Sequence, residues 1–207
     1  MRLGVLGPCN GDVVCLAKAA QVMLDRARAD RVLYVGSDDA LDRVVAAWAH
    51  DIVGANPSEQ VMFERAARAC LNATSTEIED FVASERARRR LRVYATVPAP
   101  PGRTIEILDG RVAVLLYDKA TLDEDDIAGA SILVFGKSDK PLVHRVGSRT
   151  FVAPGPVSYE GNSGVLVFDD DVGGGLAIDF LTLAGEVARR EKIEPRPHVQ
   201  GAKMKVQ

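Results

Sequence analysis

The chain contains few of the residues that build disulfide frameworks and imidazole-rich metal sites. Its 207 residues include three cysteines and three histidines. Cys9, Cys15 and Cys70 form no C-x-x-C pair, so we expect reduced thiols in an intracellular protein. Cys9 lies before a predicted helix, where the pKa of a thiol can fall. Only His144 follows a loop that could face it, so nucleophilic catalysis would depend on that one pair.

Long apolar runs and an excess of positive charge are also absent. No apolar stretch approaches the ~18 residues of a membrane span, and the N-terminus lacks the pattern of a secretory signal. A formal net charge of -3 argues against general binding to nucleic acid or membrane surfaces. Apolar residues make up 47% of the chain, which is ordinary for a globular domain. We therefore expect a cytoplasmic protein with one main domain.

The first twelve residues, MRLGVLGPCNGD, predict a strand, a loop and the start of a helix. An alternating apolar run ends at Gly7-Pro8, and helical apolar spacing follows over residues 12–29. Runs at 31–39 and 50–56 predict two more strands, with a helix at 41–49 between them. This order indicates a parallel sheet, with a candidate site at the carboxyl ends of its strands.

Residues 57–91 carry helix signals only and predict a helical hairpin set on or beside the sheet. Asn56-Pro57-Ser58-Glu59 resembles a helix start, and Thr76 with Glu79 predicts a second capped helix. The apolar face of the first helix comprises Phe63, Ala66, Ala67, Cys70 and Leu71. The second helix ends in a basic run, Arg86–Arg92. That run is either a docking patch for an anionic partner or a solvated helix end.

From residue 93 onward the pattern is one of strands. Asp109-Gly110 between two alternating runs predicts a hairpin over 104–118. A short acidic helix and a buried strand at 131–136 follow, then strands on both sides of Gly147-Ser148. A closing hairpin spans 163–183. We expect a short charged helix at 184–192 and a disordered tail at 193–207.

Six short loops follow the apolar runs in a recognisable order: GPCNGD (7–12), GS (36–37), ANPS (55–58), LYD (116–118), GKSDKP (136–141) and APGP (153–156). In this order the chain resembles the calcineurin-like metallophosphoesterases, in particular the small single-domain phosphodiesterase branch. Loops of that family read S-D-x-H-G-N, G-D, G-N-x-D, G-H-T-H-x-P and N-P-G-S. The resemblance covers residues 1–183, with 57–91 as a helical insertion. It implies an α/β fold, a four-layer α/β/β/α sandwich of two packed sheets with helices outside.

The resemblance also implies where a two-metal site would lie, and most of its ligands are missing. A two-metal site needs a bridging carboxylate and several imidazole or carboxylate ligands. Proline offers no ligand atom, and a lysine brings positive charge to a metal position. The degenerate positions are Pro8, Asn10, Ser37, Asn56, Tyr117, Lys137 and Asp139. Nearby candidates for a rebuilt site are Asp12, Asp38, Asp118 and His144.

These losses predict a protein without catalytic residues, bound metal or cofactor. We expect a scaffold or regulatory module that binds an unidentified protein partner, similar to the retromer's phosphoesterase-like subunit, with no nucleic-acid or membrane partner. One alternative is an active metal-dependent phosphoesterase with a single rebuilt Mn or Zn site. Another is an anion or nucleotide sensor in which Lys137 and Lys140 hold the ligand.

Overall fold

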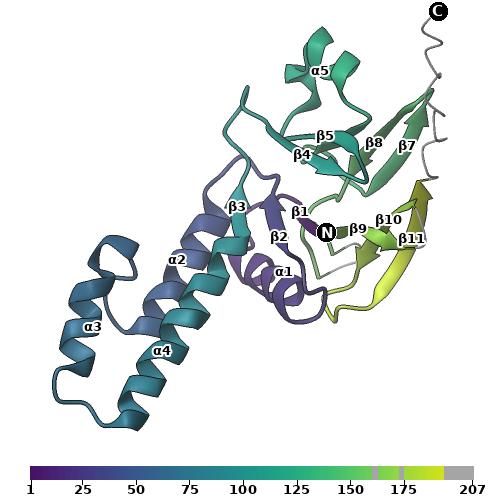
Figure 1. Cartoon of the computed structure of the whole chain (residues 1–207). Helices are drawn as coiled ribbons and strands as arrows, with labels where there is room; N and C mark the ends of the chain where they lie inside the picture. The colour runs from purple at the N-terminus through teal and green to yellow at the C-terminus, as the bar shows by residue number, and fades with distance from the viewer. Residues whose placement is uncertain (160–162, 173–174, 194–207) are drawn as a thin grey trace, which may run out of the picture.

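The computed structural model describes residues 1–159, 163–172 and 175–193, which form two β-sheets packed face to face (Figure 1). The larger sheet has the strand order β11-β10-β9-β1-β2-β3 and the smaller one β4-β5-β6-β8-β7. The larger sheet comprises β1 (Arg2–Leu6), β2 (Arg31–Tyr34), β3 (Tyr94–Thr96), β9 (Val165–Val172), β10 (Gly175–Leu181) and β11 (Val187–Ile193). The smaller sheet comprises β4 (Thr104–Leu108), β5 (Arg111–Leu116), β6 (Ile132–Phe135), β7 (Leu142–Val146) and β8 (Arg149–Ala153).

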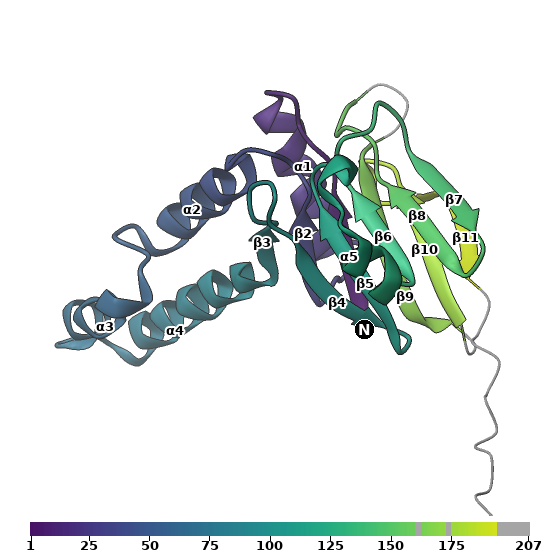
Figure 2. The same cartoon turned by 90° about the horizontal axis from the view of Figure 1, so that it is seen from above.

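Three layers of buried apolar side chains hold the two sheets and their helices together. Leu3, Val5 and Ile132 are among the fully buried residues between the sheets. Helices α1 (Val13–Asp25) and α2 (Ala40–Val53) cover the outer face of the larger sheet. The short helix α5 (Glu124–Gly129) lies over the outer face of the smaller sheet, above a small cluster around Leu133 (Figure 2). The predicted four-layer sandwich is therefore confirmed.

Local sequence chemistry explains several of the predicted elements. Strands β1, β2 and β3 pair in parallel, as βαβ connections require. The β4–β5 hairpin turns at Asp109 and Gly110, whose φ angles of 49° and 66° match a two-residue turn of the primed type. Strands β7 and β8 pair across Gly147-Ser148, and β9 with β10 forms the predicted closing hairpin.

The prediction of a third strand at 50–56 is wrong. Helix α2 continues to Val53 and ends at Gly54, which adopts the left-handed conformation at φ 62°. Val45, Trp48, Ala49 and Ile52 recur at helical spacing and pack against the core, so this run follows the helical period. The third parallel strand is instead β3, which pairs with β2 after the helical segment.

The short charged helix predicted at 184–192 is also wrong, because residues Val187–Ile193 form the edge strand β11. This strand pairs antiparallel with β10. Arg190 donates through Nε to Asp179 Oδ1 at 2.6 Å, and the Asp179 carboxylate is buried. Most side chains of this edge strand are exposed, and most are charged. A solvated helix has the same composition, so the sequence alone did not distinguish the two. A disordered tail is predicted at 193–207, but Ile193 ends strand β11, and residues 194–207 lie outside the described residues.

An arm of three helices projects from the larger sheet (Figures 1 and 2). It consists of α2, the 3-10 turn η1 (Glu59–Val61), α3 (Met62–Cys70) and α4 (Ser75–Arg90). The capping box of α4 is formed by Thr74 and Glu77, two residues before the predicted Thr76–Glu79 pair. The remaining 3-10 turns are η2 (Leu91–Val93) and η3 (Lys119–Thr121).

Candidate functional site

The loops that follow β1, β2, β5, β6 and β8 pack together at one edge of the two sheets. The N–H of Val35 donates to the carbonyl of Leu6 at 2.9 Å, and that of Lys137 donates to the carbonyl of Tyr117 at 2.8 Å. The loops after β1 and β8 meet where the N–H of Val157 donates to the carbonyl of Pro8 at 2.9 Å. The structure therefore brings five of the six sequence-predicted loops to one place.

Two glycines permit this close packing between the sheets. A Cβ added to Gly136 would lie 1.7 Å from the carbonyl oxygen of Val35, and one added to Gly7 would lie 1.7 Å from that of Gly155. No side chain fits at either position without moving a neighbouring backbone. These glycines therefore join the loops of one sheet to those of the other.

The phenol of Tyr34, which the sequence analysis did not single out, lies beneath the loops after β1 and β2. The side chain is fully buried. Its hydroxyl accepts a hydrogen bond from the N–H of Cys9 at 3.1 Å and donates one to Asp38 Oδ1 at 2.9 Å. Burial raises the pKa of the Tyr34 phenol well above its ordinary value, and the hydrogen bonds with the Cys9 thiol and Asp38 add to this rise, whereas the N–H of Cys9 opposes it. A tyrosine in a run of apolar residues was the only signal in the sequence.

Lys137 and Asp118 form an ion pair across the ends of β6 and β5. The Nζ of Lys137 lies 2.6 Å from Asp118 Oδ2. The hydrogen bond from Lys137, together with one from the N–H of Ala120, lowers the pKa of the Asp118 carboxyl. The same contact raises the pKa of the Lys137 ammonium. Lys137, at a degenerate ligand position, therefore pairs with Asp118, one of the acids considered for a rebuilt site.

The two other acids proposed for a rebuilt site also have structural partners. Asp12 caps α1 by accepting a hydrogen bond from the N–H of Cys15 at 2.9 Å. Asp38 accepts from Tyr34 and from the N–H of Ala40 at the start of α2. These carboxylates stabilise helix starts and the buried phenol.

The remaining positions at this edge offer little ligand chemistry. Asn10 occupies a left-handed turn at φ 48° and is exposed, as are Ser37 and Asp139. Pro8 and Tyr117 are half-buried. Asp139 is the one carboxylate among these five residues.

Two candidates lie elsewhere in the fold. Asn56 lies in the loop between α2 and η1, where its Oδ1 accepts from the N–H of Ser58 at 2.9 Å. Asn56 was assigned to the loop after a third strand at 50–56, and that strand does not exist. The loop that follows the actual third strand, β3, reads Val97-Pro98-Ala99-Pro100. His144 is exposed in the middle of edge strand β7, opposite Phe151.

The residues present do not fit the two-metal site of the family resemblance. Among the described residues, no group of three or more His, Cys, Asp or Glu side chains is arranged to hold a metal ion. The carboxylates of Asp12, Asp38 and Asp118 bind an ammonium group, a phenol or backbone N–H groups instead.

Comparison with solved structures identifies the architecture. A single mutant of Vps29 from Entamoeba histolytica superposes with a TM-score of 0.50 at 15% identity, covering 94% of this chain and 100% of that one. Vps29 from Cryptosporidium parvum gives a TM-score of 0.50 at 12% identity, covering 93% of this chain and 97% of that one. The chain has the calcineurin-like metallophosphoesterase fold. No family profile matches the sequence, and no curated protein matches it.

Within this phosphoesterase fold, the arm is held by a buried network of charges. Arg65 Nε and Arg88 Nε each donate to the carboxylate of Glu85 at 2.8 Å, and Arg65 also donates to the carbonyl of Ser58 at 2.8 Å. All three charged side chains of this network are buried. Glu59 pairs with Arg88, Arg89 and Arg92 at the base of the arm. Three arginines of the predicted basic run therefore bind acids of the same chain.

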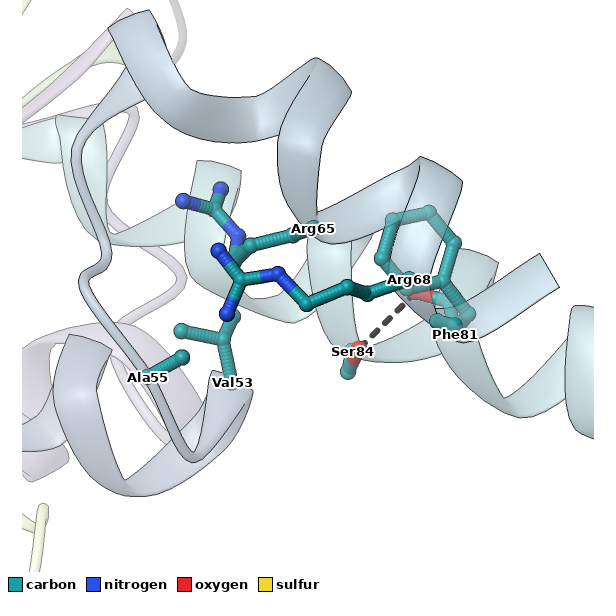
Figure 3. Close-up of a pocket in the computed structure, with 7 residues that line it drawn as sticks. Val53, Ala55, Arg65, Arg68, Phe81 and Ser84 are labelled. Atoms are coloured by element: carbon teal, nitrogen blue, oxygen red, sulfur yellow. Dashed lines mark hydrogen bonds between the residues drawn. The ribbon is translucent and has the colours of Figure 1, made fainter. Parts of the chain in front are cut away.

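A hollow of about 260 Å³ lies between the helices of the arm (Figure 3). Its walls are mostly apolar, with the arginine side chains of α3 extending across it; the lining residues are Val53, Ala55, Arg65, Arg68, Ala69, Phe81 and Ser84. Arg65 already binds Glu85, whereas Arg68 is 77% exposed and has only a loose contact with Glu64 at 3.7 Å. No helix among the described residues is long and apolar enough to span a bilayer.

Proposed function

We propose that this chain is a non-catalytic phosphoesterase-like protein that acts by binding other proteins. The observation that carries the proposal is the Lys137–Asp118 ion pair. It places a fixed positive charge at a degenerate ligand position and uses a carboxylate that a rebuilt site would need. The structural roles of Asp12 and Asp38 support the same conclusion.

The arm supports the protein-binding part of this proposal. Its large apolar side chains Phe63 and Leu71 are 78% and 75% exposed, so they contribute little to the stability of the folded chain. Exposed apolar groups gathered on one element are typical of protein interfaces.

Metal content and hydrolysis together test the loss of catalysis. We expect the untreated purified protein to contain no stoichiometric Mn, Zn or Fe by elemental analysis. We also expect no hydrolysis of bis(p-nitrophenyl) phosphate above the rate of buffer with Mn²⁺ or Zn²⁺. Turnover that EDTA abolishes, and that Asp139→Ala removes without unfolding the protein, would contradict the proposal and support the rebuilt-site alternative.

The sensor alternative is tested separately, by thermal unfolding with inorganic phosphate and with nucleotides. Because Lys137 is already neutralised by Asp118, we expect no stabilisation that rises with ligand concentration. A saturable shift that Lys140→Gln removes would favour an anion sensor over a scaffold.

A further inference from the structure

The arm has an inverted distribution of side chains, with charges inside and large apolar groups outside. The buried side chains of α3 and α4 are Arg65, Glu85 and Arg88, which are 6% to 7% exposed. Phe63 and Leu71 are 78% and 75% exposed at the outer side of α3. The buried side chains of α3 and α4 thus bind one another as ion pairs, and Phe63 and Leu71 remain exposed to another molecule.

The exposed apolar residues form one stripe along α3. Phe63, Ala67 and Leu71 recur every fourth residue, which places them on the same side of a helix. Arg65 lies two positions from both Phe63 and Ala67, about 200° around the helix, and points into the arm. In both views α3 is at the outer end of the arm, away from the sheets (Figures 1 and 2). The stripe, composed of Phe63, Ala67 and Leu71, therefore faces away from the rest of the chain.

The stripe is complementary to itself when two copies run antiparallel. With a two-fold axis beside Ala67, the Phe63 of one copy lies opposite the Leu71 of the other, and the two Ala67 residues meet. The small side chain at the centre allows close approach of the helices, while the large side chains at the ends fill the space on either side. A two-fold interface requires this kind of palindromic order.

The charges beside the stripe fit the same register. Glu64 and Arg68 lie next to each other on one flank of α3, are 68% and 77% exposed, and contact each other only at 3.7 Å. In the antiparallel arrangement, the Glu64 of one copy lies beside the Arg68 of the other, and the reverse pair forms on the same flank. Oppositely charged flanks select the antiparallel register.

We propose that α3 is a self-association site, through which two copies of this chain pair antiparallel along Phe63, Ala67 and Leu71. This inference rests on the protein-binding part of the proposed function. Glu77, Glu79 and Asp80 at the start of α4, near Leu71 in the chain, disfavour an anionic membrane as the occupant instead. Because α3 has nine residues, the contact belongs to the small class of interfaces, and the dimer is weak and concentration-dependent.

Sedimentation velocity on the full chain over a dilution series tests the association. The wild-type chain is expected to shift from monomer towards dimer as its concentration rises. Phe63→Glu and Leu71→Glu each place a charge in the interface and should abolish the shift. Ile105→Glu is the matched control, because Ile105 is 60% exposed on β4, away from the arm, and should leave the shift unchanged. Far-UV circular dichroism checks that each variant is folded.

Two further variants test the register itself. Glu64→Arg and Arg68→Glu each put like charges opposite one another and should weaken association roughly two- to tenfold, whereas the double variant should restore it. Ala67→Cys in a Cys70→Ser background should form a disulfide between two copies under mild oxidation, because the axis passes beside residue 67.

A wild-type chain that stays monomeric throughout the dilution series overturns the proposal. So does a dimer that persists in Phe63→Glu, or a double charge variant that associates no better than the single ones. Binding of the chain to lipid vesicles through Phe63 while it stays monomeric would assign the stripe to a membrane instead. None of these results depends on the hydrolysis assays, so a failure of this inference is distinguishable from a failure of the proposed loss of catalysis.

Discussion

Lys137 Nζ lies 2.6 Å from Asp118 Oδ2, and the two residues are 19 positions apart in the chain. They belong to loops that follow the adjacent parallel strands β6 and β5. The pair occupies part of the edge where the family resemblance places metal ligands. At this point of the fold the two side chains are bound to each other.

Removing Lys137 should shift the titration of Asp118. The hydrogen bond from Lys137 is the largest cause of the lowered pKa of Asp118, so Lys137→Gln should raise that pKa towards its ordinary value of about 3.9. Carboxyl-detected NMR over an acid titration measures this change. Lys140→Gln is the control and should leave the Asp118 titration unchanged. Identical Asp118 curves in wild type and Lys137→Gln would show that the pair does not form in solution.

Tyr34→Phe should destabilise the edge loops without emptying the core. The variant keeps the buried ring but leaves the N–H of Cys9 without this acceptor and Asp38 without one of its two donors. An unsatisfied buried group costs about 1–3 kcal/mol, which urea denaturation resolves. Tyr159→Phe, at a side chain that is 55% exposed, should change the free energy of unfolding by less than about 0.5 kcal/mol. Equal stabilities of the two variants would contradict the structural role assigned to the phenol.

Gly136→Ala should be among the most destabilising single substitutions in this chain. The added Cβ would lie 1.7 Å from the carbonyl oxygen of Val35, so the two sheets would have to separate locally. We expect a loss of roughly 3 kcal/mol or more, or failure to accumulate folded protein. Gly129→Ala in α5 is the matched control: its Cβ meets nothing within 4 Å, and the helix gains about 0.5–1 kcal/mol. Thermal unfolding of both variants is the measurement, and a well-folded Gly136→Ala would refute the packing argument.

Glu85→Gln should unfold the arm selectively. It removes the charge that faces both buried arginines, Arg65 and Arg88, and breaking such a buried pair costs about 3–5 kcal/mol. Hydrogen exchange should increase across 62–90 while the sheets stay protected. Glu79→Gln on the exposed side of α4 is the control and should leave exchange unchanged. Uniform exchange changes across the whole chain would mean that the arm is not a separate unit of stability.

Acid should affect the same network before it affects the sheets. Burial raises the pKa of Glu85, but the hydrogen bonds from Arg88 and Arg65 outweigh it, so the folded pKa is lowered. The stabilisation from Glu85 is therefore complete above its unfolded pKa of about 4.3 and is lost as the pH falls through the lower folded value. We expect helical circular dichroism to decrease below about pH 4, before the strands of the two sheets lose their protection from hydrogen exchange. A simultaneous loss of both signals would contradict a separately titrating arm.

The sequence predicted strands well where turn chemistry and alternation coincide. Asp109-Gly110 defines its hairpin because both residues tolerate positive φ angles. The prediction failed at 50–56 and 187–193. The apolar residues of these short segments are compatible with both the helical and the strand period. Contacts distant in the chain decide between helix and strand: the core beneath α2, and strand β10 beside β11.

The sequence predicted which loops gather at the candidate site, but not every residue that lies there. The degenerate loops after β1, β2, β5, β6 and β8 meet at one edge because carboxyl ends of neighbouring strands share that edge. Asn56 and His144 do not belong there, because one depended on the wrong strand and the other lies within β7. Tyr34 was missed because an apolar run gives no sign of where a phenol hydroxyl points.

The sequence by itself determined most of the strands and most of the turns, because those depend on backbone preferences and on the chemistry of single side chains. Only the tertiary structure decided which charges meet. The packing of elements distant in the chain pairs Lys137 with Asp118 and Glu85 with Arg65. Local sequence patterns do not predict that packing. The tertiary structure also decided that Phe63, Ala67 and Leu71 are exposed while Ala66 and Cys70 of the predicted apolar face are half-buried, since Arg65 takes the inner position by binding Glu85. Periodicity predicts that a helix has an apolar face, but the surrounding contacts decide whether that face is covered.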